Sequence, residues 1–162
     1  MALIIEAPNE IYSIENFNNI SLFLAGSITD CPDWQSEVIH EIKDIENLSV
    51  YNPRRKNFPI NDPNAAEKQI TWEYLHLSTA DIISFWFDKN SLGPICLYEL
   101  GFHANSKDDI NIIIGIDPEY KRRQDVEIQT KLIKPKTKFV YSIDDLITEI
   151  KDLMYIKNFN KQ

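Results

Sequence analysis

The feature that most constrains the fold is an alternation of short apolar runs with segments of helical periodicity. Five runs have the length and composition of strands that are buried on both faces, at 20–28, 48–53, 81–87, 110–116 and 137–142. Four helical patterns alternate with them, at 34–45, 67–80, 94–106 and 143–156. Crossover connections of this kind join parallel strands, so the order predicts an α/β fold with a five-stranded parallel sheet and helices on both faces.

Two segments stand outside this alternation. Residues 1–19 precede the first core strand, and we expect an N-terminal extension or an edge hairpin there. The charged stretch 117–134 indicates no clear type of secondary structure. The chain has 162 residues and no internal repeat or low-complexity tract, so we expect a single domain over 1–162.

Charge and cysteine content exclude several classes of function. Seventeen Lys and Arg against 25 Asp and Glu give a net charge of −8, which argues against nucleic acid and anionic membranes as partners. A small anionic ligand stays compatible with a local pocket. Cys31 and Cys96 form no metal-ligand pattern, and the three histidines share no ligand spacing. No apolar run is long enough to cross a membrane, and Glu6 and Pro8 interrupt any signal sequence. We expect a cytoplasmic protein with reduced thiols, no metal and no cofactor.

Parallel sheets of this class bind ligands at the carboxyl ends of their strands, near the point where the strand order reverses. The predicted strands therefore direct attention to the loops at 26–32, 52–65 and 88–94, and to the loop after Ile116.

Glu99 is the most unusual residue, because it lies in a helical segment that is apolar on nearly every side. Burying an unpaired carboxylate is expensive, so such a residue either reaches solvent, pairs with a cation or serves in a pocket as a nucleophile or base. Glu73 lies between Trp72 and Tyr74 on the preceding predicted helix, where it either faces solvent or lies near the ligand-binding rim. Two carboxylates in differing environments are what glycosyl chemistry uses.

Several other side chains are candidates for holding a ligand, each with a structural alternative. Gly26 and Ser27 follow the first strand, where backbone N–H groups can hold a phosphate or hydroxyl, although a tight turn explains them equally well. Arg54 can recognise an anion or can belong to a solvated loop. The three tryptophans can stack on a base, although core packing is their commoner use; they are Trp34, Trp72 and Trp86.

Motifs in order along the chain resemble the nucleoside 2-deoxyribosyltransferase-like family, from about Ser21 to Ile150. The motifs are FLAGSI, DWQ, NPRR, TWEYLHLSTAD, FWF and PICLYELGFHA, and ELG-x-x-A is the most specific of them. The chain is most similar to the short branch that carries FLAGSI, NPRR and FWF. The resemblance implies a flavodoxin-like three-layer sandwich and cleavage of an N-glycosidic bond, and related enzymes are often dimers or larger.

The resemblance also implies roles for individual residues. Glu99 matches the family's nucleophilic glutamate, and Glu73 matches an acidic position that is usually aspartate. Ser91 lies where the nucleotide-cleaving branch has a phosphate-contacting serine, but two residues further from the glutamate. Gly93 stands where the transferases have an aspartate, for which Asp88 is a candidate substitute in the same loop.

The expected function is therefore cleavage or transfer of the N-glycosidic bond of a (deoxy)nucleoside or (deoxy)nucleotide through a glutamate nucleophile. Water as the acceptor makes the protein a hydrolase, and a second base makes it a transferase. Two alternatives stay open. One is a non-catalytic nucleotide-binding module of the same fold, and the other is an NAD-cleaving glycohydrolase.

Overall fold

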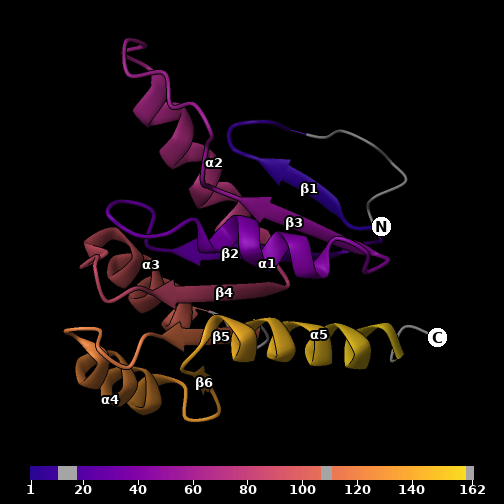
Figure 1. Ribbon diagram of the computed structural model, residues 1–162, viewed down its shortest axis with the longest axis vertical. Coiled ribbons are helices and arrows are strands. Elements are labelled where there is room, and N and C mark those ends of the chain that lie inside the picture. The colour runs from indigo at the N-terminus through magenta and orange to yellow at the C-terminus, as the bar shows by residue number, and fades with distance from the viewer. Residues whose placement is uncertain (11–17, 107–110, 160–162) are drawn as a thin grey trace.

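The computed structural model describes residues 1–10, 18–106 and 111–159, and Figure 1 shows the course of the chain. The described part contains a parallel sheet of the strands β1 (Leu3–Glu6), β2 (Ile20–Gly26), β3 (Leu48–Asn52), β4 (Ile82–Phe87), β5 (Asn111–Ile116) and β6 (Lys138–Val140). The helices are α1 (Trp34–Ile42), α2 (Ala65–Thr79), α3 (Pro94–Ser106), α4 (Arg123–Ile133) and α5 (Ile143–Phe159). The predicted parallel α/β sheet is confirmed.

The N-terminal segment departs from the expectation. Leu3–Glu6 form β1, which pairs in parallel with β3, with Ile4 opposite Val50. An edge hairpin would need an antiparallel neighbour, and β1 has none among the described residues. The sheet therefore has six strands instead of five, because β1 covers the otherwise open edge of β3. The rest of that expectation concerns residues 11–17, which lie outside the described residues.

The charged stretch without a predicted type also forms a regular element, helix α4. Its buried residues are only Val126 and Thr130, one helical turn apart. Ile128 and Leu132, on the same helix, are exposed. The apolar stripe is too narrow to stand out from the surrounding charges, which is why periodicity did not reveal the helix.

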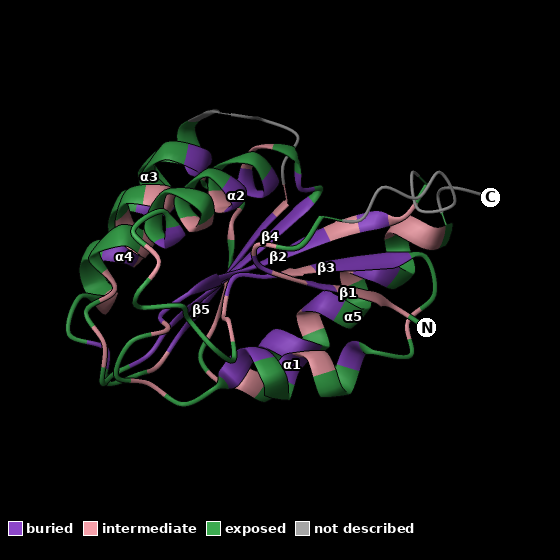
Figure 2. Cartoon of the chain, turned by 90° about the horizontal axis from the view of Figure 1, so that it is seen from above, coloured by how far each residue is buried: buried purple, intermediate pink, exposed green. Residues whose placement is uncertain are grey.

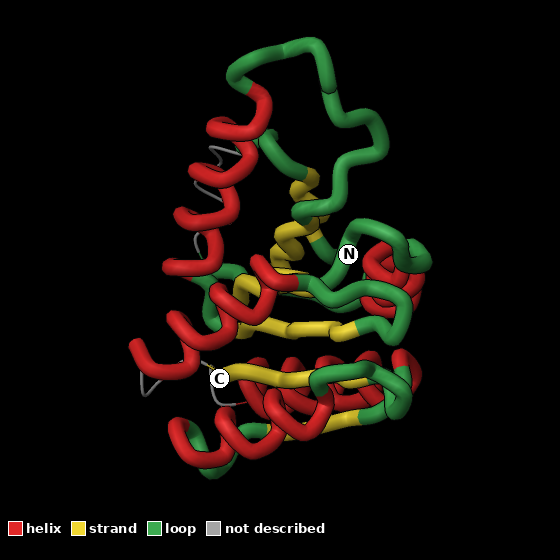
Figure 3. Tube along the Cα trace, turned by 90° about the vertical axis from the view of Figure 1, so that its left-hand side faces the viewer, coloured by secondary structure: helices red, strands yellow, loops and turns green. Residues whose placement is uncertain are grey.

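Helices cover both faces of the sheet (Figures 2 and 3). Helices α1 and α5 pack on one face, where Val38 and Ile150 are buried against strand residues such as Leu22. Helices α2, α3 and α4 pack on the other face, where Leu100 is buried against Phe85. The strand residues alternate between these two cores, as expected for strands buried on both sides. Within the described residues, no helix has the length and apolar character to cross a membrane.

The strand order creates a crevice at the carboxyl ends of the central strands β2 and β4. The order is β1-β3-β2-β4-β5-β6, so the chain moves from β2 to one side and then returns to the other side at β4. Loops that follow β2 and β4 diverge at this point, which is where sheets of this class bind ligands.

Gly26 ends β2 beside this crevice with a φ of +142°. A Cβ atom here would lie 2.3 Å from the carbonyl oxygen of Trp86 on β4, so the close approach of the two strands requires glycine.

Candidate active site

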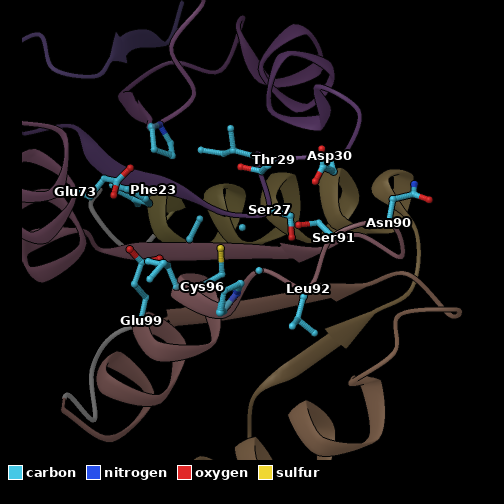
Figure 4. Close-up of a pocket in the computed structure, with 17 residues that line it drawn as sticks. Phe23, Ser27, Thr29, Asp30, Glu73, Asn90, Ser91, Leu92, Cys96 and Glu99 are labelled. Atoms are coloured by element: carbon cyan, nitrogen blue, oxygen red, sulfur yellow. The ribbon is translucent and has the colours of Figure 1, made fainter. Parts of the chain in front are cut away.

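A cavity of about 600 Å³ opens at the carboxyl ends of β2 and β4 (Figure 4). Residues 26–30 after β2 form one wall, and residues 90–96 after β4 form another. Pro53 is the one contribution from the loop after β3. The loops at 26–32 and 88–94 therefore line this cavity, whereas the loop after β5 contributes no lining residue among those described.

Two acidic side chains from different helices meet this cavity. Glu73 comes from the middle of α2 and Glu99 from the second turn of α3, and both are partly buried. Figure 4 shows them at one end of the cavity, close to Phe23 and Cys96. No cation of the described part pairs with Glu99. The same two carboxyl groups also border an apolar groove of about 290 Å³ between α2 and α3.

Burial and mutual repulsion raise the affinity of this pair for a proton. Burial raises the pKa of Glu99 to about 8, and the charge of Glu73 adds to the shift. Burial also raises the pKa of Glu73, but a hydrogen bond from Gln69 opposes the increase. Near neutral pH Glu99 therefore holds a proton in the free protein. Two coupled carboxyl groups of this kind can exchange a proton and supply a nucleophile in turn.

Polar groups gather at the opposite end of the cavity, where Figure 4 shows Ser27, Ser91, Asn90 and Asp30. Ser27 is only 1% exposed, and its Oγ has no hydrogen-bond partner among the described residues. A Cβ atom on Gly93 would lie 3.0 Å from that Oγ, so glycine keeps this end of the cavity open. An unpartnered hydroxyl that lines a cavity is suited to a ligand oxygen.

Asp88 does not line the cavity. Its Oδ1 accepts hydrogen bonds from the backbone N–H and the side-chain amide of Asn90, at 2.8 and 2.9 Å. The carboxylate therefore shapes the turn that presents Asn90 and Ser91. A direct contact of Asp88 with a ligand is not supported, because its side chain is engaged within the loop.

Arg54 does not line the cavity either. Its guanidinium donates to the carbonyl oxygens of Pro32 and Cys31, at 2.8 and 3.2 Å, and to Gln35 Oε1 at 3.2 Å. A 3.6 Å ion pair with Asp33 engages the remaining nitrogen. The structure therefore places the donors of Arg54 on the loop after β2 and not on the cavity wall, and a contact between Arg54 and a ligand anion stays a prediction.

The tryptophans belong to the two cores and not to the cavity wall. Their exposed fractions are 2% for Trp34 and Trp72 and 5% for Trp86. The indole nitrogen of Trp34 donates to the Ser27 carbonyl, and that of Trp72 to the Asn9 carbonyl, both at 2.9 Å. The indole rings pack in the hydrophobic cores on the two faces of the sheet, so none of the three is exposed in a position to stack on a base.

Gln69 contacts two residues of the site, although it does not itself line the cavity, and the sequence did not reveal it. Its Nε2 donates to the Pro53 carbonyl and to Glu73 Oε1, at 2.8 Å each. The spacing of four residues between Gln69 and Glu73 is the only signal that pointed to this pair, because such residues are neighbours on a helix.

The thiol of Cys96 also borders the site without being activated. Burial, followed by the charges of Glu99 and Glu73, raises its pKa to about 12. The thiol therefore stays protonated and is a poor nucleophile. Among the described residues, no group of His, Cys, Asp and Glu is arranged to hold a metal ion.

Comparison with known proteins adds independent findings. Residues 19–120 match the family model described as "Nucleoside 2-deoxyribosyltransferase like". A crystal structure of a conserved protein from Enterococcus faecalis V583 superposes with a TM-score of 0.61 at 16% identity, covering 83% of this chain and 98% of that chain. That similarity establishes the fold alone. No curated protein matches.

Proposed function

The chain belongs to the nucleoside 2-deoxyribosyltransferase-like family, and from this premise we propose that it cleaves or transfers the N-glycosidic bond of a (deoxy)nucleoside or (deoxy)nucleotide. The observation that supports the proposal most strongly is the carboxylate pair. Glu73 and Glu99 reach one cavity from two helices, and burial together with the charge of Glu73 raises the pKa of Glu99 to about 8.

In the proposed reaction, the proton of Glu99 first passes to Glu73. The freed Glu99 carboxylate attacks C1′ as the C1′–N bond breaks, and the bonding electrons pass to the base nitrogen, which takes the proton from Glu73. The product is a glycosyl ester of Glu99. Glu73 then removes a proton from water or from a second base as that acceptor attacks C1′, and the ester bond breaks to restore Glu99.

Gly26, Ser27 and Ser91 are proposed to hold the sugar or a phosphate attached to it. All three line the cavity, and Ser27 and Ser91 lie at the opposite end from the carboxyl groups (Figure 4). The buried Ser27 Oγ can donate to a ligand oxygen without first breaking a hydrogen bond within the described protein. We propose that a ligand held there extends toward the carboxyl groups, with the bond between its sugar and its base near Glu99.

The activity is tested by incubating the protein with deoxynucleosides, their monophosphates and NAD, with and without a second base. Release of free base supports a hydrolase, and formation of a new nucleoside supports a transferase. Release of nicotinamide supports an NAD-cleaving glycohydrolase. An increase in melting temperature without any product would instead favour a non-catalytic binding module.

The reaction requires one proton on the carboxylate pair, so kcat/KM is expected to depend on pH with a bell shape. The alkaline limb should lie near pH 8, where Glu99 loses its proton and the pair can no longer supply one to the base. In Glu73→Gln the repulsion is removed, so the pKa of Glu99 should fall. A stopped assay across pH measures the wild-type profile, and NMR of ¹³C-labelled glutamate measures the titration of Glu99 in both proteins. A Glu99 midpoint that is unchanged in the variant would contradict the coupling of the two carboxyl groups.

We also propose that the protein is a homo-oligomer. The side chains of α2 and α3 that surround their common groove are largely exposed and apolar: Ile70, Tyr74, Ile95, Tyr98 and Phe102. A contiguous apolar face of this kind marks an interaction surface. Sedimentation at micromolar concentration should show a dimer or larger species, and Tyr98→Glu should shift it toward monomer. A monomeric wild-type protein would contradict the proposal.

A further inference from the structure

We propose that Gln69 is a positioning residue, whose amide is fixed by the Pro53 carbonyl and holds Glu73 as a hydrogen-bond acceptor beside Glu99. The inference rests on the proposed function for its catalytic meaning, but its geometry can be tested without any activity.

The orientation of the Gln69 amide follows from its partners. The Pro53 carbonyl oxygen can only accept a hydrogen bond, and it lies 2.8 Å from Gln69 Nε2. Rotating the amide by 180° would place two acceptor oxygens against each other. The NH₂ group is therefore fixed toward Pro53, and its second hydrogen faces Glu73 Oε1, also at 2.8 Å.

This orientation of the Gln69 amide is energetically unfavourable for its oxygen atom. Gln69 Oε1 is buried and has no hydrogen-bond partner among the described residues. An unsatisfied buried acceptor is unfavourable, and a methionine of similar length would avoid it. What glutamine adds at this position is the donor that Glu73 receives.

The donor biases the position of the proton in the carboxylate pair. A hydrogen bond to Oε1 stabilises the charged form of Glu73 and opposes the effect of burial. The titratable groups that border Glu73 in its two cavities are Asp30, Tyr74, Cys96, Tyr98, Glu99 and His103. Because Glu99 has no comparable donor among the described residues, Gln69 makes Glu73 the charged member of the pair and leaves the proton on Glu99.

The decisive variant is Gln69→Met, which keeps the length of the side chain and removes the donor. Gln124→Met, at an exposed position on α4, is the matched control. The titration of Glu73 is followed by NMR of ¹³C-labelled glutamate, with the signal assigned from Glu73→Gln. Its midpoint should rise by about one pH unit in Gln69→Met and should not move in Gln124→Met.

With an active protein, Gln69→Met should also lower kcat by about tenfold, leave KM nearly unchanged and move the acidic limb of the pH profile upward. A midpoint that stays within about 0.2 units of the wild-type value overturns the inference, whatever the activity. An inactive wild-type protein with a shifted midpoint would instead contradict the proposed function and leave the positioning role standing. Urea denaturation of each variant verifies that it is folded.

Discussion

Glu99→Gln is expected to reduce turnover of the N-glycosidic bond by roughly a thousandfold or more. The amide is nearly isosteric with the carboxyl group, so the cavity keeps its shape. It cannot, however, form the glycosyl ester or give a proton to Glu73. Binding of the substrate should change far less than kcat, since the loss concerns an interaction that forms as the bond breaks. The measurement is single-turnover release of base under saturating enzyme.

The matched control is Glu67→Gln, an exposed position on α2, which should keep wild-type turnover. If Glu99→Gln retains more than about a tenth of the wild-type rate, the carboxylate is not the nucleophile. If the variant also fails to bind substrate, its defect lies in the shape of the cavity.

The same variant is expected to become more stable than the wild-type chain as the pH rises. Glu99 has its ordinary pKa of 4.5 in the unfolded chain and a pKa of about 8 in the folded one. The folded state therefore holds the proton more tightly than the unfolded state. As a result, the free energy of unfolding of the wild-type chain decreases as the pH rises from 4.5 to 8. The contribution of this proton to the stability of the wild-type chain is fully present below pH 4.5 and is lost as the pH rises through 8.

Glutamine at this position carries no titration, so the free energies of unfolding of the two chains should diverge over this range by on the order of 5 kcal/mol. Urea denaturation at a series of pH values measures the difference. The raised pKa of Glu73 contributes to both chains and largely cancels. Parallel stability curves would show that Glu99 titrates normally and does not lie in a desolvating environment.

Much of the sheet and its helices could be predicted from the sequence because strands buried on both faces leave an unmistakable apolar run. The run 110–116 and strand β5 illustrate this agreement. The strand at 3–6 was not predicted, because a short edge strand has few buried positions. The carboxyl ends of β2 and β4 were predicted as the ligand-binding edge from general rules of parallel sheets.

The site was less predictable where a residue type has two uses. Glu99 stood out because its surroundings in the sequence are apolar. Arg54 and Trp34 match binding chemistry equally well, but the structure assigns them to a loop brace and a core. Gln69 has no distinguishing neighbours in the sequence. Its importance depends on the Pro53 carbonyl, 16 residues away in the chain, and only the folded chain brings the two together.

The hydrogen bonds of Arg54 limit how the loops around the cavity can be exchanged to change the substrate selectivity of the protein. These hydrogen bonds join two loops that follow neighbouring strands. Arg54 belongs to the loop after β3, and its guanidinium donates to backbone oxygens of the loop after β2. If only one of the two loops were replaced by that of a relative, the guanidinium of Arg54 or the carbonyl oxygens that it contacts would lose their hydrogen-bond partners. Engineers who wish to retune selectivity should transplant both segments together.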